Sequence, residues 1–199
     1  MREFENPDHW DMAAQHYEKT AHPFTERYAE AALDRIRLGP DSRVLDVAAG
    51  TGALALAAAR TGAQVLATDF SPGMVARITA AELPNVEARV MDGQALALPD
   101  GAFDAVFSIF GVIMFPDWRK GLAEMVRVTR PGGHGIVATW QERGAATFLL
   151  LGNIRRDLFP GRDSMAMPEA VGALSDPNDF AREMIAAGYR DPDIERVTY

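Results

Sequence analysis

The feature that most constrains the fold of this chain is a regular alternation of short apolar segments with segments of helical periodicity. Apolar runs predict strands over residues 44–48, 64–68, 86–91, 104–109 and 135–140. Apolar residues at three- and four-residue spacing predict helices over residues 51–61, 72–83 and 118–129. Strand and helix in turn imply right-handed crossovers, and hence a parallel sheet with helices on both faces. The predicted fold class is therefore α/β, with a doubly wound, Rossmann-like and mostly parallel sheet.

The segments outside this alternation divide the chain, which at 199 residues is expected to form one domain. We expect an N-terminal helical cover at 1–38, a core at 41–140, an insertion at 141–175 and an incomplete C-terminal part at 176–199. The cover carries two amphipathic helical patterns, and the insertion carries an apolar helix at 145–159 followed by a loop. The C-terminal part predicts a helix at 177–187 and a strand at 193–197.

Composition narrows the range of partners. The formal net charge of −8 and the pI of about 5.0 oppose binding to nucleic acid, which needs clustered Lys and Arg. The chain has no cysteine, and no group of carboxylates and histidines has metal-ligand spacing. No apolar run approaches the roughly 18 residues of a membrane span, and the charged first residues lack a signal core. We therefore expect a cytoplasmic enzyme, without nucleic acid, a membrane span or a metal ion.

A small-residue turn, which includes Gly50 and Gly52, follows the first strand and opens a helix. Small residues let the backbone approach a ligand closely, and the free amides of a helix start favour an anionic group. In open α/β sheets, ligands bind beyond the carboxyl ends of the strands, where the strand order reverses. The alternative is a tight strand-to-helix connection that binds nothing. The residues that end the neighbouring strands distinguish the two interpretations.

Two acidic residues end the next strands. Asp69 ends the second strand, where a carboxylate can accept bonds from two ribose hydroxyls. It could instead cap the following helix, but Ser71 before Pro72 suits that role better. Asp92 ends the third strand and could accept the amino group of an adenine, or simply form a turn with Gly93. Acids that close successive parallel strands beside one crevice together predict a site for adenosine.

At these residues the sequence resembles the class I S-adenosylmethionine-dependent methyltransferases, in particular the type 11/25-like subgroup that modifies small metabolites such as quinone precursors. Residues 44–52 are similar to the first motif of that family, with Ala48 in place of its first glycine. Residues 69–74 resemble its ribose and adenine motif, 92–104 its adenine loop and next strand, and 130–133 its turn into the fifth strand. The resemblance covers roughly residues 41–140 and implies methyl transfer from S-adenosylmethionine to a small-molecule acceptor.

The resemblance also implies the residues that hold the cofactor. The first motif, which contains Asp46, Ala48, Gly50 and Gly52, would lie against the methionine part, and Asp69 against the ribose. Phe70 and Met74 would flank the adenine. The remaining cofactor residues would be Asp92, Gly93 and Gln94 along the adenine edge, Ser108 and Ile109 near the amino group, and Tyr17 as a front cover. For Tyr17, an ordinary core aromatic is an equal alternative.

The catalytic residue stays unassigned, because alignment and exclusion of water can supply much of the rate of a methyl transfer. Residues 110–115 are apolar where the resembling subgroup often has polar or histidine residues, which predicts an apolar acceptor pocket. His9, His16 and His22 remain as candidate bases, with packing roles as the commoner alternative, and His134 is expected to be structural.

Two other functions share parts of this pattern. A nicotinamide-dependent oxidoreductase also needs a glycine turn and a ribose acid, but Ala55 stands at its third glycine position. A non-catalytic S-adenosylmethionine-binding protein stays open.

The resembling family completes its sheet with a last strand that inserts beside the fifth, and no residue follows Tyr199 to supply it. We expect the missing strand either to lie beyond this residue or to come from a second copy in a homodimer.

Overall fold

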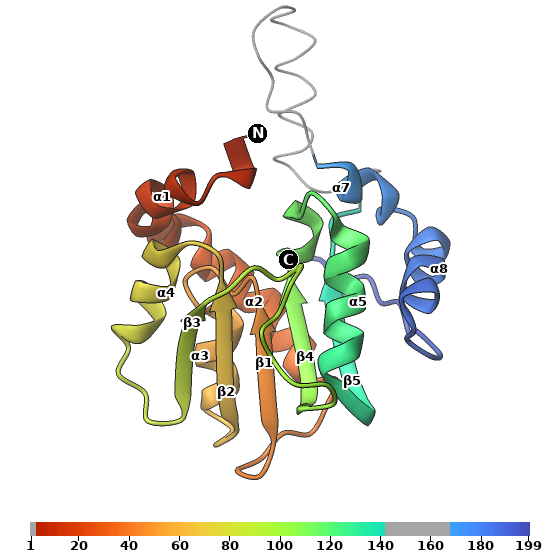
Figure 1. Cartoon of the computed structure of the whole chain (residues 1–199), viewed down its shortest axis with the longest axis horizontal. Helices are drawn as coiled ribbons and strands as arrows, with labels where there is room; N and C mark the ends of the chain where they lie inside the picture. The colour runs from red at the N-terminus through yellow and green to blue at the C-terminus, as the bar shows by residue number, and fades with distance from the viewer. Residues whose placement is uncertain (1–2, 142–167) are drawn as a thin grey trace, which may run out of the picture.

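The computed structural model describes residues 3–141 and 168–199 and contains one five-stranded sheet (Figure 1). The strands are β1 (Arg43–Val47), β2 (Gln64–Asp69), β3 (Val86–Val90), β4 (Phe103–Ile109) and β5 (Thr129–Ala138). Their order is β3-β2-β1-β4-β5, and every neighbouring pair is parallel. The predicted α/β class and parallel sheet are therefore confirmed. The order reverses between β1 and β4, so a ligand crevice is expected at their carboxyl ends.

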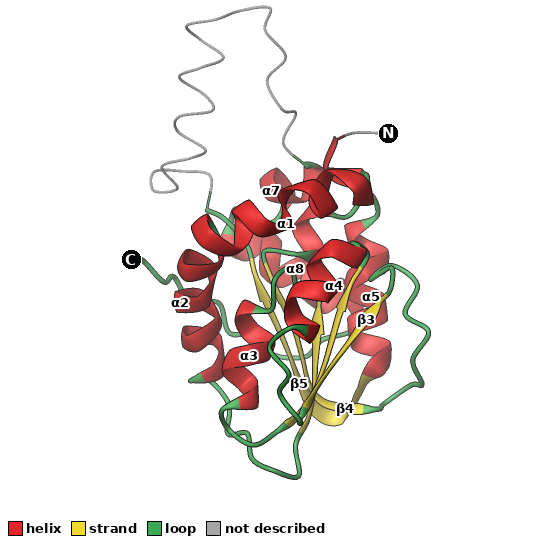
Figure 2. Cartoon of the chain, turned by 90° about the vertical axis from the view of Figure 1, so that its left-hand side faces the viewer, coloured by secondary structure: helices red, strands yellow, loops and turns green. Residues whose placement is uncertain are grey.

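Helices cover both faces of the sheet (Figure 2). α2 (His22–Leu33) and α3 (Ala53–Ala59) pack on one face with Ala29, Leu54 and Val65 in their core. α5 (Trp118–Val128) and α8 (Pro177–Ala187) cover the other face. β1 is buried on both sides from its second residue onward, because the two helical layers enclose it.

The N-terminal segment crosses the carboxyl ends of the strands. It consists of a 3₁₀ helix η1 (Glu3–Glu5) and α1 (Pro7–Thr20), followed by α2. α1 begins where the Asn6 side chain accepts a bond from the Asp8 amide, with Pro7 at the first helical position. α1 packs against α4 (Pro72–Thr79), the helix that follows β2 (Figure 1). The two predicted N-terminal helices are therefore present, and the first lies over the sheet end.

The predicted strand at 193–197 is wrong, because residues 189–199 form no helix or strand. Polar contacts hold this segment against α2 instead. Arg35 of the turn after α2 pairs with Asp193 and, at 2.6 Å, with Glu195, and the Tyr199 hydroxyl donates to the Arg27 carbonyl at 2.9 Å. β5 is one of the two edge strands of the described sheet, and a strand donated to it by a second copy stays a prediction.

The described part of the region after β5, from residue 168 onward, also differs from expectation. Residues 142–167, with the expected helix at 145–159, lie outside the described residues. Where a loop was expected, a short helix α7 (Glu169–Ala173) buries Ala170 and Val171 in the core beside η2 (Val112–Met114). β5 begins at Thr129, earlier than predicted, since the segment before His134 forms a bulge against β4 instead of a separate turn.

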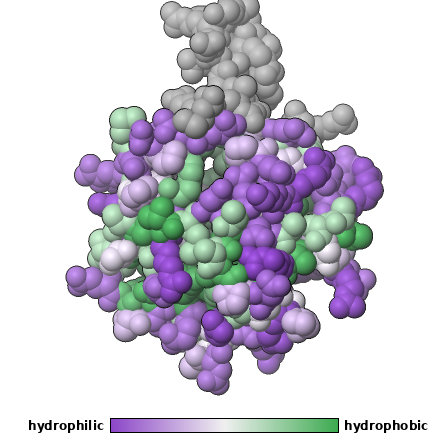
Figure 3. All heavy atoms as spheres, in the orientation of Figure 1, coloured by the Kyte–Doolittle hydropathy of each residue, from purple (hydrophilic) through white to green (hydrophobic). Residues whose placement is uncertain are grey.

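The surface is mixed in character. In the space-filling view, apolar side chains show in the middle of this face and hydrophilic ones around its margin (Figure 3). Within the described part of the chain, the search for a helix both long and apolar enough to cross a membrane finds none.

Candidate functional site

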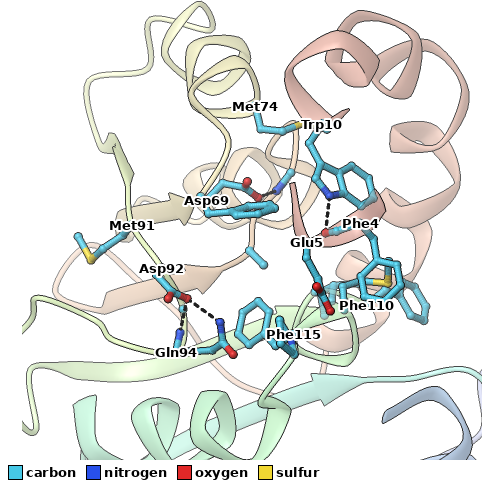
Figure 4. Close-up of a pocket in the computed structure, with 18 of the residues that line it drawn as sticks. Phe4, Glu5, Trp10, Asp69, Met74, Met91, Asp92, Gln94, Phe110 and Phe115 are labelled. Atoms are coloured by element: carbon cyan, nitrogen blue, oxygen red, sulfur yellow. Dashed lines mark hydrogen bonds between the residues drawn. The ribbon is translucent and has the colours of Figure 1, made fainter. Parts of the chain in front are cut away.

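A cavity of about 260 Å³ opens at the carboxyl ends of the strands, beneath η1 and α1 (Figure 4). Its lining comes from four strand ends and from the N-terminal segment. The described lining residues are Phe4, Glu5, Trp10, Tyr17, Ala48, Gly50, Asp69, Phe70, Met74, Met91, Asp92, Gly93, Gln94, Ile109, Phe110, Gly111, Met114, Phe115 and Pro116. The crevice lies where the reversal of strand order predicts it.

The turn after β1 has an unusual backbone. Ala48, Gly50 and Gly52 have φ angles of 56°, 55° and 89°, all in the left-handed region. Glycine adopts this region freely, whereas an alanine pays about 1–2 kcal/mol for it. The Ala48 side chain fits because Gly111 faces it, and a Cβ at Gly111 would lie 2.6 Å from the Ala48 Cβ. The two small residues together let the turn approach the cavity.

Asp69 fixes two segments of the cavity wall. Its carboxylate accepts the Gly50 amide at 2.9 Å and the Ser71 amide at 3.0 Å, so it ties the β1 turn to the start of α4. Ser71, not Asp69, caps α4 by accepting the Met74 amide, as expected from the sequence. Burial raises the pKa of Asp69, while the backbone bonds oppose this rise. A side chain in the cavity wall with two oxygens suits a ligand that offers hydroxyl donors.

Asp92 is both a turn residue and a cavity residue, so the two interpretations of the sequence are compatible. Its Oδ1 accepts the Gln94 amide at 2.9 Å and the Gln94 side-chain Nε2 at 3.0 Å (Figure 4). The Gln94 Oε1 in turn accepts the Asp117 amide at 2.8 Å. A Cβ at Gly93 would lie 2.4 Å from the Phe115 ring, so only glycine permits this approach. The chain holds the Asp92 carboxylate at the cavity edge.

Tyr17 closes the cavity from the side of α1. Its ring lies 3.7 Å from the position of a Cβ on Gly50 and packs edge-on to Trp10, with ring centres 6.1 Å apart. Burial, and then the neighbouring Asp69, raise the pKa of the Tyr17 phenol. The phenol therefore stays protonated and can donate a hydrogen bond into the site.

The opposite end of the cavity is aromatic. Phe110, Met114 and Phe115 line it, as the apolar 110–115 run predicts. Phe110 has a φ of 60°, a strained conformation for a bulky residue. Its ring stacks on Trp140 with centres 3.8 Å apart and planes 3° from parallel. Stacking of this kind, worth about 0.5–1.5 kcal/mol, helps to hold the strained residue in place.

Comparison with known proteins decides the family. Residues 44–133 match the methyltransferase domain family. A demethylmenaquinone methyltransferase of Corynebacterium efficiens is 35% identical over 176 residues, which cover 83% of this chain and 75% of the relative. The protein of that name from Thermus thermophilus is 35% identical over 178 residues, covering 82% of this chain and 81% of the relative. The chain belongs to the methyltransferase family.

Solved structures agree on the fold of this methyltransferase. A SAM-dependent methyltransferase of Thermotoga maritima superposes with a TM-score of 0.69 at 16% identity, covering 92% of this chain and 80% of the other. A SAM-dependent methyltransferase of Aquifex aeolicus gives 0.61 at 23% identity, with 81% and 79% covered. The protein is thus a class I enzyme of the small-molecule type with S-adenosylmethionine as its cofactor. Neither the oxidoreductase nor the non-catalytic alternative finds support among these relatives.

Most of the cofactor residues expected from the sequence line the cavity of the methyltransferase, and three do not. Gly52 begins α3, where a Cβ would meet Ile78 at 2.9 Å, so its role is to let α3 and α4 approach. The Ser108 hydroxyl donates to the Val47 carbonyl at 2.9 Å and accepts the Val112 amide, which ties β4 to β1 and η2. Asp46 accepts the Ala55 amide at 3.1 Å and is buried beneath the turn.

None of the histidines expected as bases is among the described lining residues of the cavity. His22 Nδ1 is hydrogen-bonded to the Thr51 hydroxyl at 2.8 Å, behind the β1 turn. His9 packs edge-on to Trp10, with ring centres 5.6 Å apart. His134 lies opposite Ala105 on the edge strand β5 with an exposed side chain, and its expected structural role stays a prediction. Among the described residues, no group of three or more His, Asp or Glu could hold a metal ion.

Several lining residues were missed at the sequence level. Phe4 and Glu5 come from η1, which is too short to show a periodic pattern in the sequence. Trp10 carries such a signal, since it lies seven residues before Tyr17 and so shares a helix face with it. Met91, Gly111 and Pro116 are flanking residues of the strand ends and follow from the fold.

Asp46 predicts a pH dependence of stability. Complete burial raises its pKa from the ordinary 3.8 to about 7. Between pH 4 and 7 the folded protein therefore holds a proton that the unfolded chain has lost, so this contribution to the free energy of unfolding falls as pH rises and is lost above about pH 7. Asp46→Asn keeps an acceptor for the Ala55 amide and should flatten the pH dependence. Urea unfolding of the wild-type and Asp46→Asn proteins between pH 4 and 7 measures the free energy of unfolding at each pH. If this free energy changes equally with pH in both proteins, the prediction is wrong.

Proposed function

We propose that S-adenosylmethionine lies across the β1 turn with its ribose on Asp69 and its adenine between Phe70 and Met74. Gly50 and Ala48 would face its methionine part, and Asp92 the edge of its adenine. The support is the cavity itself, where these residues meet at the ends of β1, β2 and β3 and the start of α4. The buried Asp69 offers oxygens beside the turn, and the small turn residues leave the backbone accessible.

We propose further that the acceptor is a planar aromatic molecule of the quinol type. The observation that carries this proposal is the aromatic end of the cavity, which is lined by Phe115 and by Phe110, whose ring stacks on Trp140. Flat aromatic rings pack favourably on such surfaces. The names of the Corynebacterium and Thermus relatives point to the same class, since both are demethylmenaquinone methyltransferases. A cytoplasmic site of action is part of this proposal.

Catalysis by this chain would rest on alignment. The bound cofactor supplies an electrophilic methyl group on a positively charged sulfur. Asp69, Gly50 and Tyr17 hold one end of the cavity, while Phe110 and Phe115 orient the acceptor ring at the other. η1 and α1 lie over both ends and exclude water, which strengthens the electrostatic interactions inside.

The test is a methyl-transfer assay with three acceptors: a short-chain 2-prenyl-1,4-naphthoquinol, an aliphatic amine and an aliphatic carboxylic acid. Mass spectrometry measures the methylated product and S-adenosylhomocysteine. We expect turnover of the naphthoquinol alone, because only its ring fills the aromatic end. Methylation of the amine or the acid without methylation of the naphthoquinol would refute the proposed acceptor class.

A further inference from the structure

Four described lining residues of the cavity can ionise, and three of them, Tyr17, Asp69 and Asp92, are assigned to the cofactor in the proposed function. Asp69 accepts two backbone amides, Asp92 accepts Gln94, and burial keeps the Tyr17 phenol protonated. The fourth is Glu5, which lines the cavity from η1. Among the described lining residues, Glu5 is thus the one carboxylate outside the group formed by the strand ends.

Glu5 points to the aromatic end. Figure 4 shows its carboxylate directed toward Phe110 and Phe115, away from Asp69. Two contacts fix the helix that carries it. The Phe4 side chain is buried, and the Phe4 carbonyl accepts the Trp10 indole N–H at 3.0 Å. η1 is therefore anchored to α1, and Glu5 is a half-buried residue that lines the same cavity as Phe110 and Phe115.

We propose that Glu5 accepts the proton of the acceptor during methyl transfer. The acceptor hydroxyl would lie against the Glu5 carboxylate while its ring packs on Phe110 and Phe115. As the nucleophilic atom of the acceptor forms its bond to the methyl carbon, the bond from that carbon to sulfur breaks and its electron pair stays on sulfur. The acceptor proton passes to Glu5, which later releases it to water. This inference rests on the proposed aromatic acceptor.

Glu5 suits this role better than the histidines of the same segment. A general base must lie within hydrogen-bond reach of the proton that it removes. Neither His9 nor His22 is among the described lining residues of the cavity: His9 packs edge-on to Trp10, and His22 is hydrogen-bonded to Thr51.

Binding measurements test the position of Glu5 without any turnover. The probes are 1-naphthol, which has a hydroxyl donor, and 1-methoxynaphthalene, which has none. By calorimetry, the wild-type protein should bind 1-naphthol about tenfold more tightly, because the carboxylate accepts a charge-assisted hydrogen bond. Glu5→Gln should remove most of this preference. Asp8→Asn is the matched control, since it removes one exposed negative charge nearby, and it should keep the preference.

Kinetics then test the proton transfer. With the naphthoquinol acceptor, Glu5→Gln should lower kcat about 10²-fold or more and leave the affinity for S-adenosylhomocysteine unchanged. If neither probe preference nor kcat changes in Glu5→Gln, Glu5 has no role at the acceptor. The two proposals can fail separately. If Glu5→Gln loses the preference for 1-naphthol while the wild-type protein does not methylate the naphthoquinol, Glu5 lies at the acceptor site and the proposed acceptor is wrong. Equal wild-type affinities for the two probes would overturn the position of Glu5.

Discussion

Asp69→Asn should weaken the binding of S-adenosylmethionine by about 1–3 kcal/mol, which is on the order of 5–150-fold in Kd. The substitution keeps the shape of the side chain but removes its charge and replaces one acceptor oxygen by an NH₂ donor. That donor would face either the ligand or one of the Gly50 and Ser71 amides that the carboxylate now accepts. The loss should therefore combine a missing ligand bond with a looser β1 turn.

Isothermal calorimetry with S-adenosylhomocysteine measures this effect on the folded variant, whose folding is checked by circular dichroism. Asp34→Asn provides the control, because Asp34 is an exposed acid at the end of α2 and away from the cavity. It should bind as the wild type does. Unchanged affinity in a folded Asp69→Asn protein would remove Asp69 from the cofactor site.

The sequence predicted the order of the core elements because each strand is a short apolar run between turn residues. β1 and β4 are such runs, and both are buried where the alternation places them. The missed C-terminal strand shows the limit of this reasoning. Residues 193–197 have the period of a strand, but Asp193 and Glu195 form ion pairs with Arg35 instead. Arg35 is distant in sequence, so the local pattern of residues 193–197 cannot reveal this pairing.

The same contrast applies to the site. Gly50, Asp69 and Asp92 could be predicted, since the carboxyl ends of parallel strands meet at one edge of a sheet. Asp46 in β1 and Ser108 in β4 also lie near strand ends, yet their side chains bond buried backbone groups and do not line the cavity. Glu5 could not be found, because only the docking of η1 by Phe4 and Trp10 brings it to the cavity.

Gly73→Ala should separate the N-terminal cover from the cofactor site. A Cβ on Gly73 would lie 2.8 Å from the Cα of Asp11 and 2.9 Å from its Oδ1, closer than real Cβ atoms approach. The Cα is backbone, so no side-chain rotation relieves the contact and α1 must move away from α4. Such overpacking costs typically about 1–3 kcal/mol of stability. The move would also break the bonds that Asp11 accepts from the Ser71 hydroxyl and, at 2.7 Å, from the Gly73 amide.

This displacement should weaken cofactor binding, because α1 carries Trp10 and Tyr17, which line the cavity. We expect S-adenosylhomocysteine to bind at least about tenfold more weakly, because roughly one hydrogen bond and its packing would be lost. Gly172→Ala is the matched control, since a Cβ there meets nothing within 4 Å. Hydrogen exchange separates a moved cover from general destabilisation: protection should fall in α1 and stay unchanged in β1 and β4. Equal loss across the whole sheet, or full affinity in Gly73→Ala, would mean that the position of α1 does not control the site.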